Sequence, residues 1–99
     1  MTRYRTTIAG ARVIQHPSTS LYDHATKAFA SARAGNTAWI KASDGPGSVH
    51  YAVEFRRVDD TVRVTPTVGD RPLDTRMPDT PSWIRELIEI TNRLTGGNP

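Results

Sequence analysis

Cysteine is absent from this sequence, lysine occurs only twice, and no apolar run is longer than three residues. The lack of cysteine excludes a disulfide scaffold, a zinc ribbon and thiol catalysis. The short apolar runs supply neither a membrane-spanning helix nor the hydrophobic segment of a secretory signal. We therefore expect a soluble, cytoplasmic protein that has no membrane partner.

The length of 99 residues suits one compact domain and leaves no room for two cores joined by a connector. Hydrophobic residues make up 36% of the chain, which is enough for a small core. We predict a single domain over residues 1–95. The closing Gly-Gly-Asn-Pro should form a flexible tail at 96–99, because it ends the last helical pattern.

Arginine supplies most of the positive charge, and the net charge is +3. Residues 1–58 carry eight basic and three acidic side chains, or +5, whereas residues 59–99 carry five basic and seven acidic ones, or −2. Guanidinium groups bind phosphates and carboxylates in a planar fork. The basic half is therefore compatible with an anionic partner.

The periodicity of apolar residues predicts four strands and two helices. Ser20 and Asp23 form a capping box that begins the first helix, and a Gly-Asn pair at 35–36 ends it. The second helix begins at Thr80-Pro81 and follows a long loop at 69–80. The predicted strands cover residues 3–15, 37–43, 48–58 and 61–68, the first with a bulge near Gly10.

This order, β-α-β-β-β-α, predicts an α+β fold in two layers. Three strands form an antiparallel meander, the N-terminal strand adds at an edge, and both helices cover one face of the sheet. A two-residue turn at Asp59-Asp60 pairs Phe55 with Val64 and Arg56 with Arg63. A four-residue turn at 44–47 pairs Ile40 with Tyr51. In this register Val53, Phe55 and Val64 are buried.

The same alternation predicts a basic and aromatic outer face. Trp39, Lys41, His50, Arg56 and Arg63 form this candidate site, in which an aromatic plane lies among cations. Such a surface can stack a base while it holds a phosphate. A polar outer face can also be merely solvated, or covered by another segment of the chain.

An alternative docking patch consists of Leu73, Met77 and Trp83, which would bind a protein partner. Excess apolar surface on the helices could instead be buried in a homodimer.

Enzymatic motifs have little support in this sequence. The three histidines lack the spacing of metal ligands, and no phosphate-binding, dinucleotide-binding or hydrolase motif occurs. We therefore predict no metal site, no cofactor and no catalytic residue. His50 and Glu54 share a face with Arg56 and Arg63, which makes ribonuclease chemistry the one enzymatic alternative.

The order of elements over residues 18–95 is similar to that of double-stranded-RNA-binding domains. The loop Gly-Pro-Gly-Ser-Val-His at 45–50 resembles the Gly-Pro-x-His loop of that family. The second helix begins Pro-Ser-Trp-Ile-Arg at 81–85, where the family has a lysine-rich phosphate clamp. We interpret the likeness as shared topology and assign no family.

The sequence thus favours a small non-enzymatic binding module that contacts nucleic acid through its outer sheet face. A protein-interaction or inhibitor module, of the kind that accessory or mobile genetic elements encode, is the alternative interpretation. A small ribonuclease is the third.

Overall fold

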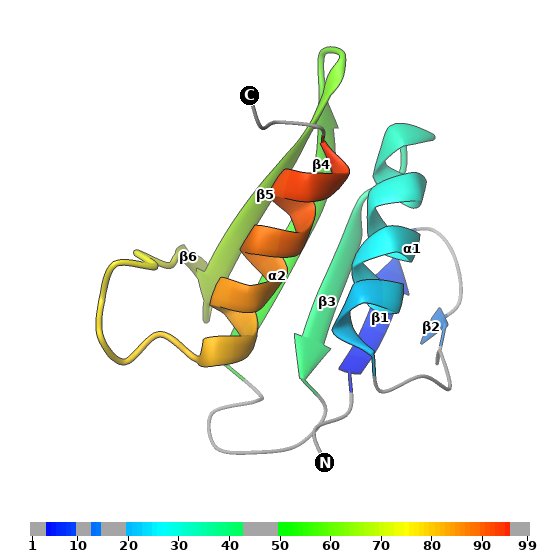
Figure 1. Cartoon of the computed structure of the whole chain (residues 1–99). Helices are drawn as coiled ribbons and strands as arrows, with labels where there is room; N and C mark the ends of the chain where they lie inside the picture. The colour runs from blue at the N-terminus through cyan, green and yellow to red at the C-terminus, as the bar shows by residue number, and fades with distance from the viewer. Residues whose placement is uncertain (1–3, 10–12, 15–19, 43–49, 96–99) are drawn as a thin grey trace.

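The computed structural model describes residues 4–9, 13–14, 20–42 and 50–95. A six-stranded antiparallel sheet, in the order β2-β1-β3-β4-β5-β6, forms one layer, and two helices lie side by side on one of its faces (Figure 1). The elements are β1 (Tyr4–Ile8), β2 (Val13–Ile14), α1 (Leu21–Arg33), β3 (Ala38–Ala42), β4 (Tyr51–Val58), β5 (Thr61–Val68), β6 (Arg71–Pro72) and α2 (Ser82–Leu94). This architecture confirms the predicted α+β class and its two layers. The predicted tail at 96–99 lies outside the described residues.

The N-terminal segment forms two strands, and the prediction of one long strand was wrong. β1 pairs with β3, as expected of an added N-terminal strand, and also with β2 in an antiparallel register of Thr6 with Ile14. The chain therefore reverses between these strands. A second short strand, β6, forms within the loop predicted for residues 69–80, where Val68 pairs with Arg71.

The β4–β5 hairpin has the predicted register. Val58 pairs with Thr61, which leaves Asp59 and Asp60 as a two-residue turn. Asp59 has a φ of +56°, a conformation that aspartate tolerates better than most residues because its short side chain bonds to the local backbone. All the predicted pairs of this hairpin, from Tyr51 with Val68 to Arg56 with Arg63, are present.

The predicted register between β3 and β4 was wrong by two residues. Ile40 pairs with Val53 instead of Tyr51, and Ala38 pairs with Phe55. The four-residue turn at 44–47, from which the register was derived, lies outside the described residues. An even shift keeps every side chain on its predicted face, because side chains alternate with a period of two.

Local capping explains where the helices begin and end. The Ser20 hydroxyl accepts a hydrogen bond of 3.3 Å from the Asp23 N–H at the start of α1, as predicted. Gly35, with a φ of +100°, follows the last turn and lets the chain leave the helix. Pro81 lies directly before α2, so its missing N–H leaves no helical hydrogen bond unmade.

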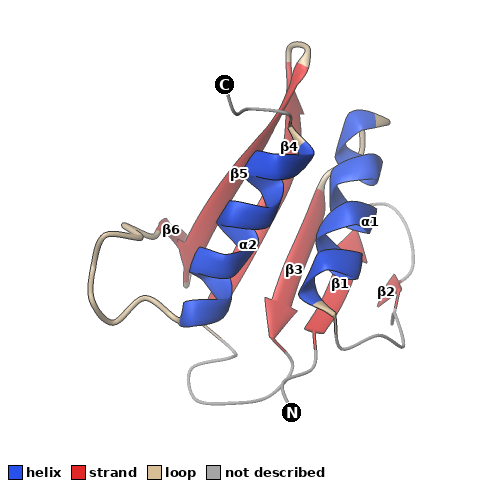
Figure 2. Cartoon of the chain, viewed as in Figure 1, coloured by secondary structure: helices blue, strands red, loops and turns tan. Residues whose placement is uncertain are grey.

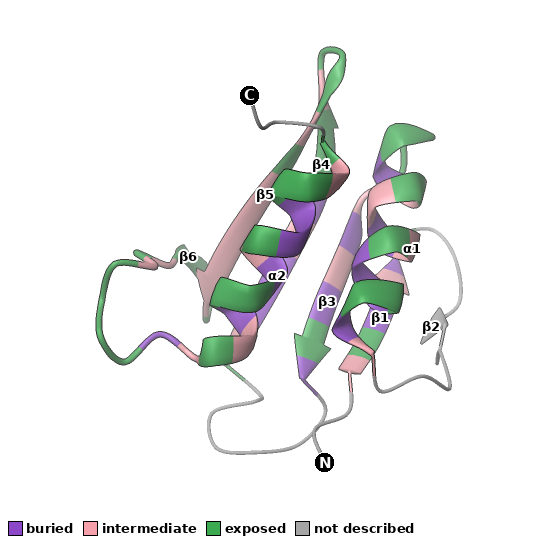
Figure 3. Cartoon of the chain, viewed as in Figure 1, coloured by how far each residue is buried: buried purple, intermediate pink, exposed green. Residues whose placement is uncertain are grey.

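The core lies between the helices and the sheet, where Figure 3 shows the buried residues. Its largest fully buried apolar side chains come from both layers; they are Phe55, Ile40, Val53, Ile84 and Leu87. Val64, which was predicted to be buried with Val53 and Phe55, is only half-buried. Among the described residues, no helix is long and apolar enough to cross a membrane.

A buried polar pair ties α1 to β1. The Oγ1 atom of Thr6 lies 2.8 Å from Nδ1 of His24, and both side chains have no exposed surface. The ring of Tyr4 meets the His24 ring edge to face at 5.9 Å. This histidine was not identified as a core residue from the sequence, although it lies on the same buried stripe of α1 as leucine and alanine residues.

Candidate nucleic-acid interface

The face of the sheet opposite to the helices has no helix packed on it in the described part of the chain. Thr6 in β1, Ile40 in β3 and Phe55 in β4 are buried beneath the helices, so the residues that alternate with them point to the other side. Figure 2 shows both helices on the same side of the sheet. We call the opposite side the outer face; within the described part of the chain no helix covers it.

Cross-strand pairing arranges the outer-face side chains in three rows. Thr7, Trp39, Glu54 and Thr65 form the central row across four strands. Arg5 lies opposite Lys41 in the row on one side, and Arg56 lies opposite Arg63 in the row on the other. Each outer row is two residues along the strands from the central row, or about 7 Å. The half-buried Trp39 therefore lies in a row between two pairs of cations, one on β1 and β3 and the other on β4 and β5, with Glu54 as its direct partner on β4.

Both of these pairs place like charges directly opposite each other, an arrangement that destabilises an antiparallel sheet. Glu54 is the one carboxylate that the described strands place on the outer face. Its Oε1 atom lies 3.6 Å from Nη2 of Arg56, whose side chain is 59% exposed, so water weakens this ion pair. The outer face thus keeps an excess of positive charge that an anionic ligand would neutralise.

Arg5 belongs to this surface although the sequence did not single it out. Alternation with the buried Thr6 and Ile8 could have placed its side chain on the outer face. Its position opposite Lys41 could not be predicted, because β1 and β3 are separated by β2 and α1 and no short turn fixes their register.

His50 is exposed and lies at the start of β4, away from the acidic residue that a ribonuclease would need. His50 and Glu54 are four positions apart in the chain, which corresponds to about 13 Å between their Cα atoms in an extended strand. The Glu54 carboxylate is instead ion-paired with Arg56, at 3.6 Å between Oε1 and Nη2. The geometry gives no support to the ribonuclease interpretation.

The residues of the alternative docking patch have different neighbours. Trp83 is half-buried and its ring lies 5.9 Å from that of Tyr4. Leu73 lines a groove on the β5 side of α2 together with Ile88. Met77 is 50% exposed on the loop between β6 and α2.

A local ion pair shapes the same loop. Nε and Nη2 of Arg76 donate to the two carboxylate oxygens of Asp74 at 3.0 and 3.2 Å, and the Arg76 backbone N–H donates to Oδ1. These hydrogen bonds from Arg76 lower the pKa of the Asp74 carboxyl from its ordinary value of 3.8. Both side chains are satisfied by each other, so this pair is a structural feature of the loop.

Among the described residues, no group of three or more histidine, aspartate or glutamate side chains could hold a metal ion. No known protein family, curated protein or solved structure matches the chain. The geometry of the outer face is therefore the basis for assigning a function.

Proposed function

We propose that this protein is a small, non-enzymatic module that binds single-stranded nucleic acid on its outer face. The observation that carries the proposal is the position of Trp39 between two opposed pairs of cations, Arg5 with Lys41 and Arg56 with Arg63. Each pair is unfavourable by itself, and a phosphate placed between its members would turn repulsion into attraction.

A single strand suits this surface better than a duplex. A base can stack on an indole only when it is not already stacked and paired within a duplex. The bases of a single strand meet this condition. The two cationic rows lie about 13 Å apart along the strands, one on each side of Trp39. The backbone of an extended strand could therefore contact both rows while one base lies on the indole. In the central row Thr7 offers a hydroxyl group beside the indole, and Thr65 offers another beyond Glu54.

The proposal can be tested by titrating fluorescently labelled single-stranded RNA and DNA oligonucleotides at two salt concentrations and measuring anisotropy. Affinity should fall as salt rises, because bound phosphates release counterions. Trp39→Ala should weaken binding by about 1–3 kcal/mol, the usual value of one stacked base. Arg63→Gln should weaken binding and reduce the salt slope by roughly 0.7, the contribution of one phosphate contact.

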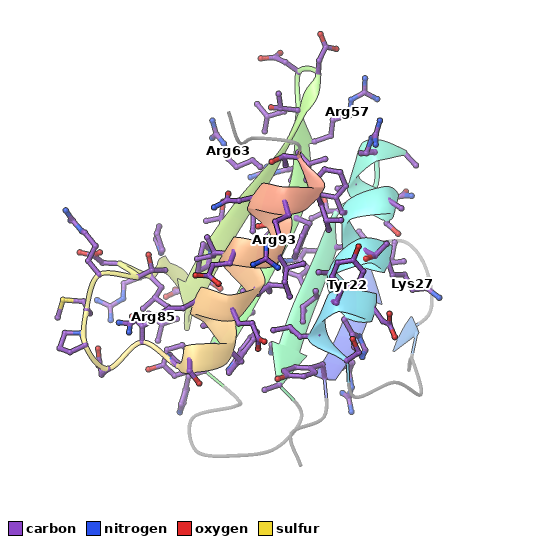
Figure 4. The ribbon with its side chains drawn as sticks, viewed as in Figure 1. Tyr22, Lys27, Arg57, Arg63, Arg85 and Arg93 are labelled. Atoms are coloured by element: carbon purple, nitrogen blue, oxygen red, sulfur yellow. The ribbon has the colours of Figure 1, made fainter. Side chains whose placement is uncertain are left out.

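Arg93→Gln is the matched control, because it removes the same charge from the exposed surface of α2, on the other side of the sheet (Figure 4). It should leave the salt slope unchanged. Trp39→Phe should keep most of the affinity that Trp39→Ala loses. Equal losses for Arg63→Gln and Arg93→Gln would contradict a specific outer-face site, and so would tighter binding of duplex than of single strands.

A further inference from the structure

The outer edge of β5, which no described strand covers between Thr61 and Thr65, is the second feature of the fold that could take a ligand. β6 pairs with β5 only at Thr67 and Val68, and the Leu73 N–H donates to the Pro66 carbonyl at 2.9 Å just beyond. No described strand lies beside β5 between Thr61 and Thr65, and Figure 1 shows that stretch as the margin of the sheet. This stretch is called the β5 edge below.

The pairing with β4 determines which backbone groups of the β5 edge face outward. The Gly69 N–H donates to the His50 carbonyl at 2.6 Å, in the same register as the rest of the hairpin. Because hydrogen-bonding residues alternate in an antiparallel pair, Arg63 and Thr65 also direct their N–H and C=O groups toward β4. Val62 and Val64 therefore direct theirs away from the sheet, toward the position of a further strand.

Pro66 supports this assignment. Its carbonyl points outward to Leu73, so its nitrogen, which has no hydrogen to donate, also faces away from β4. Proline is tolerated within a strand where the missing N–H belongs to a free edge. The same alternation places the N–H groups of Val62 and Val64 on that side.

A groove with a mixed lining lies beside the β5 edge, on the helix side of the sheet. It has a volume of about 370 Å³; its apolar part is formed by Val62, Val64, Pro66, Leu73 and Ile88, and its polar part by Thr75, Thr91, Asn92 and Thr95. These apolar side chains are half-buried, whereas Val53 and Phe55, which face the same way on the neighbouring strand, have no exposed surface. The core is therefore incompletely covered at this edge. Side chains of an added strand that point toward the helices would cover it.

Charge decides between a second copy of this chain and a different partner. In a symmetric antiparallel dimer that uses both valines, Val62 of one copy pairs with Val64 of the other. Arg63 of one copy then lies opposite Arg63 of the other. With Arg56 next to each Arg63, four guanidinium groups would then lie in one row. Like charges so placed oppose pairing, whereas a carboxylate opposite Arg63 would favour it.

We propose that the β5 edge binds an extended segment of another protein that has an acidic residue between two apolar residues. The acidic side chain lies opposite Arg63 on the outer face, and the two apolar side chains enter the groove beside Val62 and Val64. Backbone hydrogen bonds to these two valines supply affinity, and the groove and Arg63 supply specificity. This site adjoins the nucleic-acid site, and the two share Arg63.

The probe is the peptide acetyl-Ser-Thr-Val-Glu-Val-Thr-Ser-amide, titrated to millimolar concentration into ¹⁵N-labelled protein. The amides of Val62 and Val64 should shift and become protected from hydrogen exchange. A peptide with lysine in place of glutamate should bind roughly two- to thirtyfold more weakly, because it replaces an attractive cross-strand charge pair by a repulsive one. A peptide in which both valines are N-methylated should not bind, because it cannot donate to the Val62 and Val64 carbonyls.

Two protein variants complete the test. Val64→Pro removes an outward N–H without disturbing the pairing with β4, and it should abolish peptide binding while single-stranded nucleic acid still binds. Val64→Thr keeps the N–H and should retain peptide binding. If Val64→Pro does not fold, the N-methylated peptide decides the question by itself.

Three results would overturn the proposal. They are no response of Val62 or Val64 to the glutamate peptide, equal binding of the N-methylated peptide, and a concentration-dependent protection of the β5 edge in the absence of peptide. The last result would identify a second copy of the chain as the occupant. Loss of nucleic-acid binding has no bearing on this site, because the peptide titration is read at the valine amides.

Discussion

Repulsion between Arg56 and Arg63 can be measured in the free protein, without any ligand. These residues are direct cross-strand partners on the outer face, and such pairs change stability by about 0.2–1 kcal/mol. Arg63→Gln should therefore raise the free energy of unfolding by about 0.2–1 kcal/mol at low salt, or the melting temperature by up to roughly 4–8 °C for a domain of this size. Arg56→Gln should give a smaller gain, because it also removes the ion pair with Glu54 at 3.6 Å.

A double-mutant cycle separates the repulsion from the intrinsic strand preference of glutamine. Urea unfolding of the parent, both single variants and the double variant should show that the second substitution adds no further stability. High salt should reduce the gain of Arg63→Gln, since screening already weakens the repulsion between exposed charges. Additive effects of the two substitutions, or a loss of stability for Arg63→Gln at low salt, would refute the inference that the outer face carries uncompensated positive charge. The same substitutions should weaken nucleic-acid binding, so stability and binding should change in opposite directions.

Three further predictions concern the core and the loop. Phe55→Ala should lower the free energy of unfolding by about 3–5 kcal/mol in denaturant titrations, because it leaves a cavity at a fully buried position. Thr6→Val, which is nearly isosteric, should cost about 1–3 kcal/mol in the same assay because it removes the hydrogen-bonding partner at 2.8 Å from His24; an unchanged stability would show that this hydrogen bond contributes nothing. Asp74 should titrate below its ordinary pKa of 3.8 in NMR, and Arg76→Gln should return it toward that value. Since the pKa of Asp74 is lower in the folded protein than in the unfolded chain, its contribution to stability is present at neutral pH and is lost as the pH falls through the folded pKa.

Local signals in the sequence were sufficient for the elements that short-range interactions control. The Asp59-Asp60 turn allows only two residues between β4 and β5, so it fixes the whole register of that hairpin, including the opposition of Arg56 and Arg63. The capping hydrogen bond of Ser20 is also a local signal, because its partner, the Asp23 N–H, is only three residues away in the chain. It therefore predicted the start of α1.

Tertiary structure decided the features that depend on contacts between distant segments. The register of β3 with β4 differs from the predicted one. The sequence between Ala42 and Tyr51 is long enough to fit more than one turn length, and packing of the strands beneath the helices sets the pairing. The two-residue strands β2 and β6 are too short to produce a detectable alternation of apolar residues.

The candidate site shows the same division between local and distant information. Alternation along single strands was enough to assign Trp39, Lys41, Arg56 and Arg63 to one face, because a strand places every second side chain on the same side. The arrangement of Arg5 opposite Lys41 required the pairing of strands that lie more than thirty residues apart in the chain. The sequence by itself therefore determined the composition of the outer face. Only the folded sheet decided that Trp39 lies between two cationic pairs and that no described strand pairs with the β5 edge, since both depend on which strands become neighbours.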